Sequence, residues 1–204
     1  MILWTVMEEE GDRHRPLSED YLRANTVSEL KALSGPIHLV DSDPGWPRRF
    51  KEEAEKIARG LGKQALRIEH VGSTSVPGLI AKPIIDIVLA VVCSADEAQY
   101  TAALQEVGYS LHIREPGWHE HRMFKGPAND VNLHIFSAGC PEIDRMLLLR
   151  NWLRANERDR DLYAQTKLIL ALRKWKYTQN YADAKTAVIE EIISRAREKP
   201  RYAD

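Results

Sequence analysis

The sequence predicts an α+β fold, in which a mixed sheet with flanking helices is followed by a helical C-terminal half. Strand-like patterns occur between about residues 36 and 140, where helical patterns separate them. From Pro141 onward the periodicity is helical alone. A run of strands followed by a run of helices is typical of this class.

Length and composition fit a single domain. The chain has 204 residues, of which 44% are hydrophobic, so it can bury a core of ordinary size. We expect the domain to span 36–204, with a sheet part at about 36–140 and a helical part at about 141–200. Residues 1–35 are expected to form an N-terminal extension.

The charge balance argues against two classes of partner. With 29 basic and 30 acidic side chains the net charge is −1, which gives no overall field for nucleic acid or an anionic membrane. No charge-free apolar run approaches the roughly 18 residues of a membrane span. The chain starts apolar and then turns acidic, unlike a secretory signal, so we expect a cytoplasmic protein. Cys93 and Cys140 lack CxxC spacing and are expected to be reduced thiols.

Two short helices are predicted in the N-terminal extension. Ser18 is placed to cap a helix that runs through Leu22 or beyond. Thr26 to Leu33 is expected to form another turn or two, which Gly35-Pro36 ends.

A short strand and a long helix open the domain. Ile37 to Val40 is a brief strand candidate, and the turn-forming residues of 41–47 follow it. Arg48 to Leu61 is predicted to be a helix that ends at Gly62, because apolar residues recur on one face. These are Phe50, Ala54, Ile57 and Leu61.

The stretch from 66 to 92 carries the strongest indication of chemistry. An apolar strand, Leu66 to Val71, leads into the small polar turn Gly72-Ser73-Thr74-Ser75, and a second strand, Ile84 to Val92, follows. The second strand carries Asp86 inside an apolar run. A buried carboxylate is costly without a cation, a hydrogen-bond cage or a metal, so Asp86 is the first candidate for a functional residue.

The remaining elements complete the sheet and the helical half. Ala95 to Val107 is predicted to be a helix, and strands follow at 109–113, 118–125 and 131–136, which gives a sheet of about four or five strands. In the last strand, alternation places Val131, Leu133 and Ile135 on one face and Asn132, His134 and Phe136 on the other. Three helices are predicted after Pro141, at 142–156, 158–175 and 181–197.

The polar turn is a candidate anion site. Gly72 allows a close approach of the backbone, and the hydroxyl groups of Ser73, Thr74 and Ser75 can donate hydrogen bonds to a phosphate. The same residues also fit a structural turn, since the sequence contains neither GxxxxGK[ST] nor GxGxxG. Lys82 and Asp86, within 14 positions of the turn, favour the phosphate site. Phosphoryl transfer uses a cation for phosphate and a carboxylate for a divalent metal.

The residues of this turn and strand resemble a known protein family. The stretch HVGSTSVPGLIAKPIIDI resembles the signature of the GrpB family, a branch of the nucleotidyltransferase superfamily that includes DNA polymerase β-like enzymes. The resemblance covers roughly residues 36–197. It continues through DSDPGWPRRF, NLHIF, RNWLRAN, YAQTKLILA and YADAKTAVIEEI.

The resemblance implies a nucleotidyltransferase-like sheet and a site on it. In that superfamily a Gly-Ser turn holds the nucleotide phosphates, two carboxylates on the next strand bind two metal ions, and a third carboxylate lies on a later strand. Asp86 matches the first carboxylate, Val88 stands where the second should be, and His134 is the residue expected to face Asp86. The implied catalytic residues and metal ligands are therefore Asp86 and His134, for a divalent ion such as Mg²⁺ or Mn²⁺. His134 is alternatively a general base.

The helical half contains three pairs of residues with i,i+4 spacing, so that each pair lies on one helical face. Arg and Lys can donate to phosphate, and Tyr can stack on a base or direct a hydrogen bond. The pairs are candidates for an anion-lined cleft, or alternatively for solvated faces and helix-edge packing. They are Arg150 with Arg154, Tyr163 with Lys167, and Tyr181 with Lys185.

The histidines allow further hypotheses. His119 and His121 have i,i+2 spacing on a predicted strand, and together with His134 they could form a three-histidine metal site. Separate surface or cleft roles are the alternative. His70 precedes the polar turn and is expected to order it through a hydrogen bond.

Functions from different classes follow from these residues. In the first, a nucleotidyltransferase-type protein binds a nucleoside triphosphate or a similar phosphate-bearing ligand and transfers a nucleotidyl group to a small acceptor. In the second, a degenerate member of the fold binds a nucleotide or coenzyme A precursor without catalysis, as an accessory module, since relatives that resemble this family are joined to dephospho-coenzyme A kinase domains. A structural interaction module is a third hypothesis, but it gives Asp86 no purpose.

Overall fold

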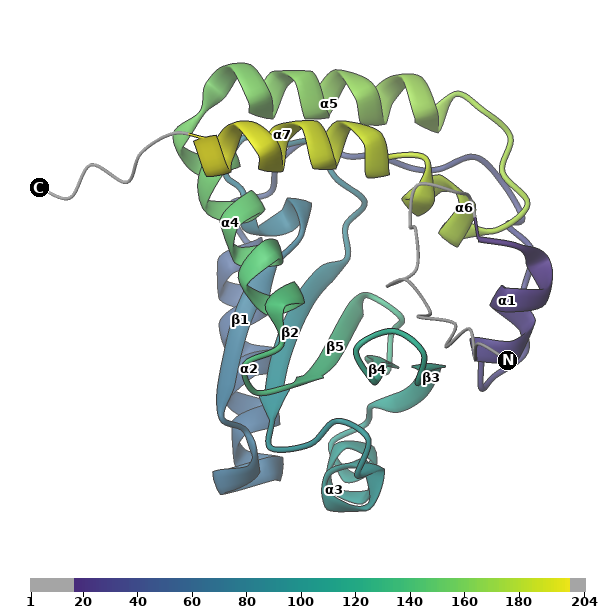
Figure 1. Cartoon of the computed structure of the whole chain (residues 1–204), viewed down its shortest axis with the longest axis vertical. Helices are drawn as coiled ribbons and strands as arrows, with labels where there is room; N and C mark the ends of the chain where they lie inside the picture. The colour runs from purple at the N-terminus through teal and green to yellow at the C-terminus, as the bar shows by residue number, and fades with distance from the viewer. Residues whose placement is uncertain (1–16, 199–204) are drawn as a thin grey trace, which may run out of the picture.

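A five-stranded mixed sheet forms the centre of the computed structural model, which describes residues 17–198 (Figure 1). The strands lie in the order β1-β2-β5-β4-β3, with β2 and β5 parallel and the other neighbouring pairs antiparallel. The predicted α+β class is confirmed. The strands are β1 (Arg67–Val71), β2 (Ile85–Val91), β3 (Ser110–Glu115), β4 (His121–Lys125) and β5 (Val131–Ser137).

Helices surround the sheet and make up the C-terminal part of the chain. The α-helices are α1 (Glu19–Asn25), α2 (Trp46–Leu61), α3 (Thr101–Glu106), α4 (Pro141–Ala155), α5 (Glu157–Ala171), α6 (Thr178–Asp183) and α7 (Thr186–Glu198). Short 3₁₀ turns lie at η1 (Gly62–Gln64), η2 (Ser73–Ser75) and η3 (Glu97–Gln99). The predicted cap of α1 is present, because the Ser18 side chain accepts a hydrogen bond from the backbone of Tyr21.

The two faces of the sheet pack against different helices. Figure 1 shows α4 in front of β1 and β2, and α2 behind them. The core behind the sheet, beneath α2 and α3, includes Ile57, Leu61, Ile87, Leu89, Leu104, Phe124, Leu133 and Ile135. The core in front, beneath α4, includes Val71, Val88, Ala90, Phe136, Ile143 and Leu147. The predicted alternation of β5 is confirmed, since Leu133 and Phe136 lie in different cores.

The helices α5 and α7 lie at one end of the sheet, where they run side by side across the top of Figure 1. Val76 and Leu79, which belong to the connector between η2 and β2, pack against Tyr163 of α5 and Ile192 of α7. The end of the sheet at which β1 stops and β2 begins is therefore covered by these helices.

Two predicted elements near the N-terminus are absent. Thr26 to Leu33 is not helical: Thr26 forms a bridge with Ile113, and the backbone of Val27 donates to His112 at 2.9 Å. The exposed edge of β3 therefore pairs with this segment and overrides its helical preference. The strand predicted at 37–40 is reduced to a single bridge, between Val40 and Ala81. The first 16 residues of the expected N-terminal extension lie outside the described residues.

Several predicted boundaries also move. The helix predicted at 95–107 consists of η3 and α3, and the strand predicted at 118–125 begins at His121, because His119 and Glu120 adopt positive φ angles of 51° and 49° in the preceding turn. The C-terminal helices number four within the described chain rather than three. The helix expected at 158–175 ends at Ala171, and the helix expected at 181–197 is divided between α6 and α7.

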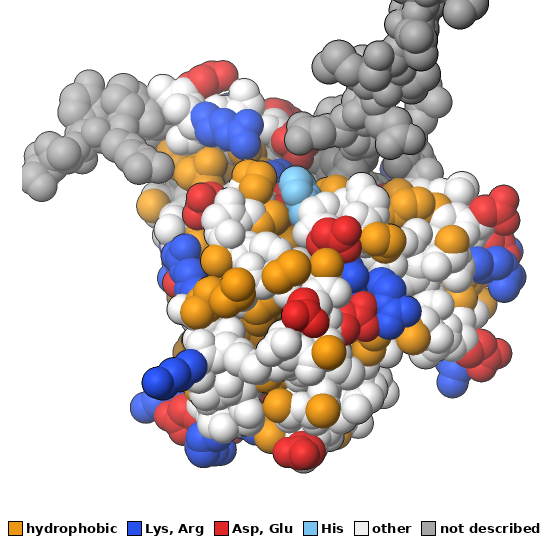
Figure 2. Space-filling model, turned by 60° about the horizontal axis from the view of Figure 1, so that its bottom comes forward, with side chains coloured by type: hydrophobic (Ala, Val, Ile, Leu, Met, Phe, Trp, Pro, Cys, Tyr) orange, Lys and Arg blue, Asp and Glu red, His pale blue; other side chains and the backbone are white. Residues whose placement is uncertain are grey.

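The surface carries charges of both signs. On the face shown in Figure 2, basic, acidic and apolar side chains of the described residues are interspersed, and they form no large area of one charge. Between residues 17 and 198, no helix combines the length and apolar character needed to cross a membrane.

Candidate functional site

The site is built where the turn η2 lies against Asp86 of β2. Val71, the last residue of β1, is paired with Asp86, so the chain must turn directly beside the carboxylate. Gly72 makes this turn with φ 67° and ψ −173°, a backbone region almost restricted to glycine. A Cβ atom at Gly72 would lie 2.4 Å from Oδ2 of Asp86. Glycine is therefore required at position 72 by both the backbone conformation and the neighbouring carboxylate.

The hydroxyl groups of the turn have different tasks. Ser75 Oγ donates to the carbonyl of Gly72 at 2.6 Å, and Thr74 Oγ1 donates to the carbonyl of Ile84 at 3.1 Å. Ser73 Oγ instead accepts a hydrogen bond from Lys167 Nζ at 3.1 Å. Of the three predicted phosphate donors, Thr74 and Ser75 thus hold the turn together, whereas Ser73 faces the lysine of the helical half.

His70 supports the turn from behind, as its position before the turn predicted. Its Nε2 lies 3.1 Å from Thr74 Oγ1, and its ring stacks on Phe50 of α2 with centroids 4.7 Å apart. Burial lowers the pKa of His70 to about 4. The ring is therefore neutral at pH 7 and acts as an ordering residue.

Asp86 is held in a polar network on the sheet. Parallel pairing places it beside Asn132 of β5, whose Nδ2 donates to Asp86 Oδ1 at 2.6 Å. Lys125 of β4 donates to Asn132 Oδ1 at 2.5 Å, which fixes the orientation of the amide, because a lysine can only donate. Burial acts to raise the pKa of Asp86, but His134, Asn132 and Lys82 outweigh it and hold the pKa below its usual value. Asp86 is therefore an ionised carboxylate at neutral pH.

His134 links Asp86 to a chain of buried polar side chains. Its Nε2 lies 3.9 Å from Asp86 Oδ1, and its Nδ1 lies 3.1 Å from Nε2 of His121. His121 Nδ1 in turn lies 2.6 Å from Glu115 Oε2. The imidazole of His134 is thus held between Asp86 on its Nε2 side and His121 on its Nδ1 side.

Lys82 and Lys185 meet at a buried tyrosine. Their Nζ atoms lie 5.9 and 5.0 Å from the ring centroid of Tyr181. Burial lowers the pKa of both lysines, while the charge of Asp86 opposes the shift. The Tyr181 hydroxyl is buried and has no hydrogen-bond partner among the described residues. This corner of the site therefore contains two ammonium groups beside a buried hydroxyl that has no hydrogen-bond partner among the described residues.

Lys167 joins the helical half to the turn. It is 2% exposed and donates to Ser73 Oγ and to the carbonyl of Ile80. Its ammonium group lies 4.8 Å from the ring centroid of Tyr163. Burial, with a contribution from Lys185, lowers the pKa of Lys167 to about 7. Burial raises the pKa of Tyr163 to about 12, so its hydroxyl remains protonated at neutral pH.

The arginine pair of α4 holds the sheet edge and the turn. Arg154 donates two hydrogen bonds to the carbonyl of Ser75, at 2.9 and 2.7 Å. Arg150 donates to Glu69 Oε2 at 2.8 Å and to the carbonyl of His70 at 2.9 Å. The spacing correctly places both residues on one helical face, and that face contacts the protein's own backbone.

The residues around Asp86 offer few ligands to a divalent metal ion. Val88 is completely buried beneath α4, so position 88 supplies no second carboxylate. Asn132 directs its amide N–H toward Asp86 and its oxygen toward Lys125, which leaves one carboxylate and one imidazole nitrogen as protein ligands. A Mg²⁺ or Mn²⁺ ion here would depend on water or on the phosphates of a bound ligand for its other ligands. In the described part of the chain, no group of three or more His, Cys, Asp or Glu side chains is arranged to hold a metal ion. The three-histidine hypothesis is wrong, since His119 lies in the turn before β4.

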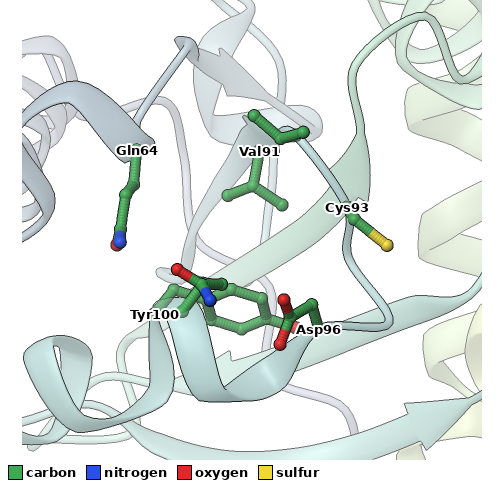
Figure 3. Close-up of a pocket in the computed structure, with 7 residues that line it drawn as sticks. Gln64, Val91, Cys93, Asp96 and Tyr100 are labelled. Atoms are coloured by element: carbon green, nitrogen blue, oxygen red, sulfur yellow. The ribbon is translucent and has the colours of Figure 1, made fainter.

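A separate hollow lies at the other end of β2. Its volume is about 260 Å³, and Figure 3 shows Gln64 and Cys93 on opposite sides with the ring of Tyr100 at its base. The Tyr100 hydroxyl is satisfied by the carbonyl of Ser94 at 2.5 Å. Among the described residues, no lysine, arginine or histidine lines this hollow, so they provide none of the positive charges that a phosphate ligand needs.

The sequence predicted part of this site. The turn, Lys82, Asp86, His134 and the tyrosine and lysine pairs were all candidates, and the fold brings them to one end of the sheet. Asn132 and Lys125 were not predicted to act on Asp86, nor Glu115 and His121 to form a chain with His134. The i,i+2 spacing of Asn132 and His134 on a strand was the available signal, because it places both on the face of Asp86.

Comparison with known proteins gives one consistent family. A family model described as GrpB protein matches residues 36–195. The chain is 56% identical over 181 residues to UPF0157 protein BH1888 of Halalkalibacterium halodurans, with 89% of this chain and 93% of that protein covered. Its fold is similar to the crystal structure of the conserved protein GrpB from Enterococcus faecalis, with a TM-score of 0.69 and 33% identity over 78% of this chain and 96% of that one.

A more distant similarity concerns a longer protein. The chain is 27% identical over 201 residues to a dephospho-CoA kinase of Mycobacterium tuberculosis, with 86% of this chain but only 49% of the kinase covered. The chain thus spans about half the length of that kinase.

Proposed function

The chain belongs to the GrpB family, and we propose that it is a nucleotidyltransferase-type protein that binds a nucleoside triphosphate, or a similar phosphate-bearing ligand, between η2 and the helical half. The observation that carries this proposal is a group of lysines that interact with Asp86 or with one another, and that have no ion pair within residues 17–198. They are Lys82, Lys125, Lys167 and Lys185. Phosphate oxygens are suitable acceptors for such donors.

Each part of the site has a place in this function. Lys167 and Ser73 hold one phosphate at the turn, and Lys82, Lys185 and Tyr181 hold another beneath the helices. Arg150 and Arg154 keep β1 and the turn in position. The site therefore combines direct phosphate donors with a rigid supporting frame.

The transfer step uses the other side of the site. The hydroxyl oxygen of a small acceptor attacks the α-phosphorus, the bond from that phosphorus to the bridging oxygen breaks, and pyrophosphate leaves with the bonding electrons. Nε2 of His134 accepts the proton of the acceptor. Asp86 lies near this imidazole and stabilises the positive charge that it gains.

A transfer assay with labelled nucleoside triphosphate and mixed small acceptors tests this function. Asp86→Asn should abolish transfer and keep the thermal unfolding midpoint of the parent, whereas Asp20→Asn, on the exposed surface of α1, should remain fully active. An Asp86→Asn variant as active as the parent would exclude the transferase function.

The accessory module is the second candidate function. Two observations favour it: Val88 replaces the second carboxylate, and a dephospho-CoA kinase contains a segment similar to this chain. In this case a nucleotide or coenzyme A precursor binds at the same lysines and is not turned over. Calorimetric binding of such a ligand, without transfer to any acceptor tried, would support the module over the enzyme.

A further inference from the structure

The site contains more positive than negative charge. Lys82, Lys125 and Lys185 each interact electrostatically with Asp86, and Lys167 interacts with Lys185. Asp86 is one of two carboxylates that act on these four lysines; the other is Asp183, which acts on Lys185. Lys167, whose pKa is about 7, is only partly protonated at neutral pH, but the other three ammonium groups still outnumber the two carboxylates. A net positive charge therefore remains in a partly buried space, where water screens charges poorly. An anionic ligand would relieve this repulsion.

The Tyr181 hydroxyl indicates where part of that anion lies. Tyr181 is 1% exposed, and its hydroxyl lacks a partner among the described residues. Leaving a buried hydroxyl without an acceptor is unfavourable. Because Lys82 and Lys185 flank the same ring, an oxygen placed among them would satisfy the hydroxyl and both ammonium groups.

A second group of donors lies at the turn. Lys167 Nζ donates to Ser73 Oγ at 3.1 Å. The charge of Lys185 lowers the pKa of Lys167, so the two ammonium groups interact. The donors at Ser73 and Lys167 and those around Tyr181 thus form two neighbouring positions for anionic groups. Two linked phosphates fit this arrangement better than one.

The environment of Asp86 indicates how the charge of the ligand is neutralised. Asn132 donates to its Oδ1, and the ammonium group of Lys125 lies directly behind that amide. A divalent ion bound to Asp86 would lie close to this amide donor and to the three lysines that interact with the carboxylate. Repulsion from these lysines opposes metal binding.

From these contacts we infer that the site binds a polyphosphate of two or more linked phosphates without a divalent metal ion, its charge being neutralised by Lys82, Lys125, Lys167 and Lys185. This inference rests on the proposed function. The lysines supply the positive charge that metal ions provide in the related superfamily, and the ligand class narrows to di- and triphosphates rather than monophosphates.

Isothermal titration calorimetry on the full chain tests the inference. ATP, ADP and AMP are each titrated in buffer with EDTA and again with excess Mg²⁺. We expect ATP and ADP to bind in EDTA at least as tightly as in Mg²⁺, and AMP to bind about tenfold more weakly than ADP, a difference of about 1.4 kcal/mol. Binding of ATP that requires Mg²⁺ would overturn the inference and leave the proposed function intact. Absence of nucleotide binding in both buffers would overturn the proposed function itself.

Two variants locate the site in the same experiment. Tyr181→Phe and Lys185→Met should each weaken ATP binding in EDTA about tenfold or more, while thermal unfolding confirms that both fold. Lys176→Met is the control, because Lys176 is 61% exposed and pairs with Glu19 of α1. Equal ATP affinity in all three variants and the parent would show that the lysines around Tyr181 do not form the site.

Discussion

Asn132 donates its amide N–H to Oδ1 of Asp86 at 2.6 Å, and this contact directs a donor, not a metal ligand, toward the carboxylate. The amide oxygen accepts from Lys125, so the amide cannot turn to offer its oxygen to a cation without leaving the lysine unpaired. A donor thus stands where a metal site would need a ligand.

Asn132→Asp should create a metal site that the parent lacks. The substitution places two carboxylates side by side on paired strands, and a divalent ion relieves their repulsion. We expect the variant to bind Mn²⁺ at least about tenfold more tightly than the parent, as measured by electron paramagnetic resonance of free Mn²⁺. Asn151→Asp, on the exposed face of α4, is the control. A parent that already binds Mn²⁺ as tightly would contradict our description of Asp86.

Gly72→Ala should be more damaging than Gly78→Ala. Both glycines have positive φ, 67° and 77°, so each substitution costs about 1–3 kcal/mol of backbone strain. A Cβ at Gly78 meets nothing within 4 Å, whereas a Cβ at Gly72 collides with Asp86. Urea unfolding should show the larger loss for Gly72→Ala, together with loss of ATP binding. Equal losses of stability in the two variants would show that the Asp86 side chain can move away from the added Cβ without an energetic penalty.

Tyr181→Phe should not destabilise the ligand-free protein, unlike Tyr100→Phe. Both tyrosines are 1% exposed, but the Tyr100 hydroxyl bonds to the carbonyl of Ser94, while Tyr181 has no partner within residues 17–198. Loss of the Tyr100 hydroxyl should cost about 1 kcal/mol. Thermal or urea unfolding of the two variants measures the difference. A comparable loss in Tyr181→Phe would mean that this hydroxyl is already satisfied.

The stability of the ligand-free protein should rise between pH 7 and pH 9 because of Lys167. Its pKa is about 7 in the folded chain against 10.5 for an ordinary lysine, so in this range the unfolded chain holds the proton that the folded chain has released. The free energy of unfolding therefore increases with pH, by at most about 1.4 kcal/mol per pH unit.

Urea unfolding of Lys167→Met at pH 7 and pH 9 measures this contribution. The variant should lack the increase, and the exposed control Lys176→Met should retain it. The same pH dependence in Lys167→Met and the parent would mean that Lys167 keeps an ordinary pKa in the folded protein.

Local patterns predicted the central part of the fold and the candidate site. The alternation of β5 placed Asn132 and His134 on the correct face, and an Asp inside an apolar run identified Asp86 before any contact was known. Period-two alternation is a property of the strand alone, so it can be inferred without knowing which strands are paired.

These local patterns could not predict contacts between elements that lie far apart in the sequence. The link between His121 and His134 depends on the register of β4 against β5, which aligns Met123 with His134. The spacing of Arg150 and Arg154 identified a shared face but not its partners, β1 and the turn. Thr26 to Leu33 is a further example. The sequence predicted a helix there, but the pairing of Thr26 with Ile113 of β3 determines the conformation.

A crystal structure of the full chain, grown with a nucleoside triphosphate in the presence of EDTA, tests the central claim most directly. We predict density for linked phosphates between Ser73 and Asp86, with Lys167 on one phosphate and Lys82, Lys185 and the Tyr181 hydroxyl on the next. Phosphate density at the hollow beside Tyr100 would contradict that claim, and so would phosphate density that appears in the site only in crystals grown with Mg²⁺ in place of EDTA.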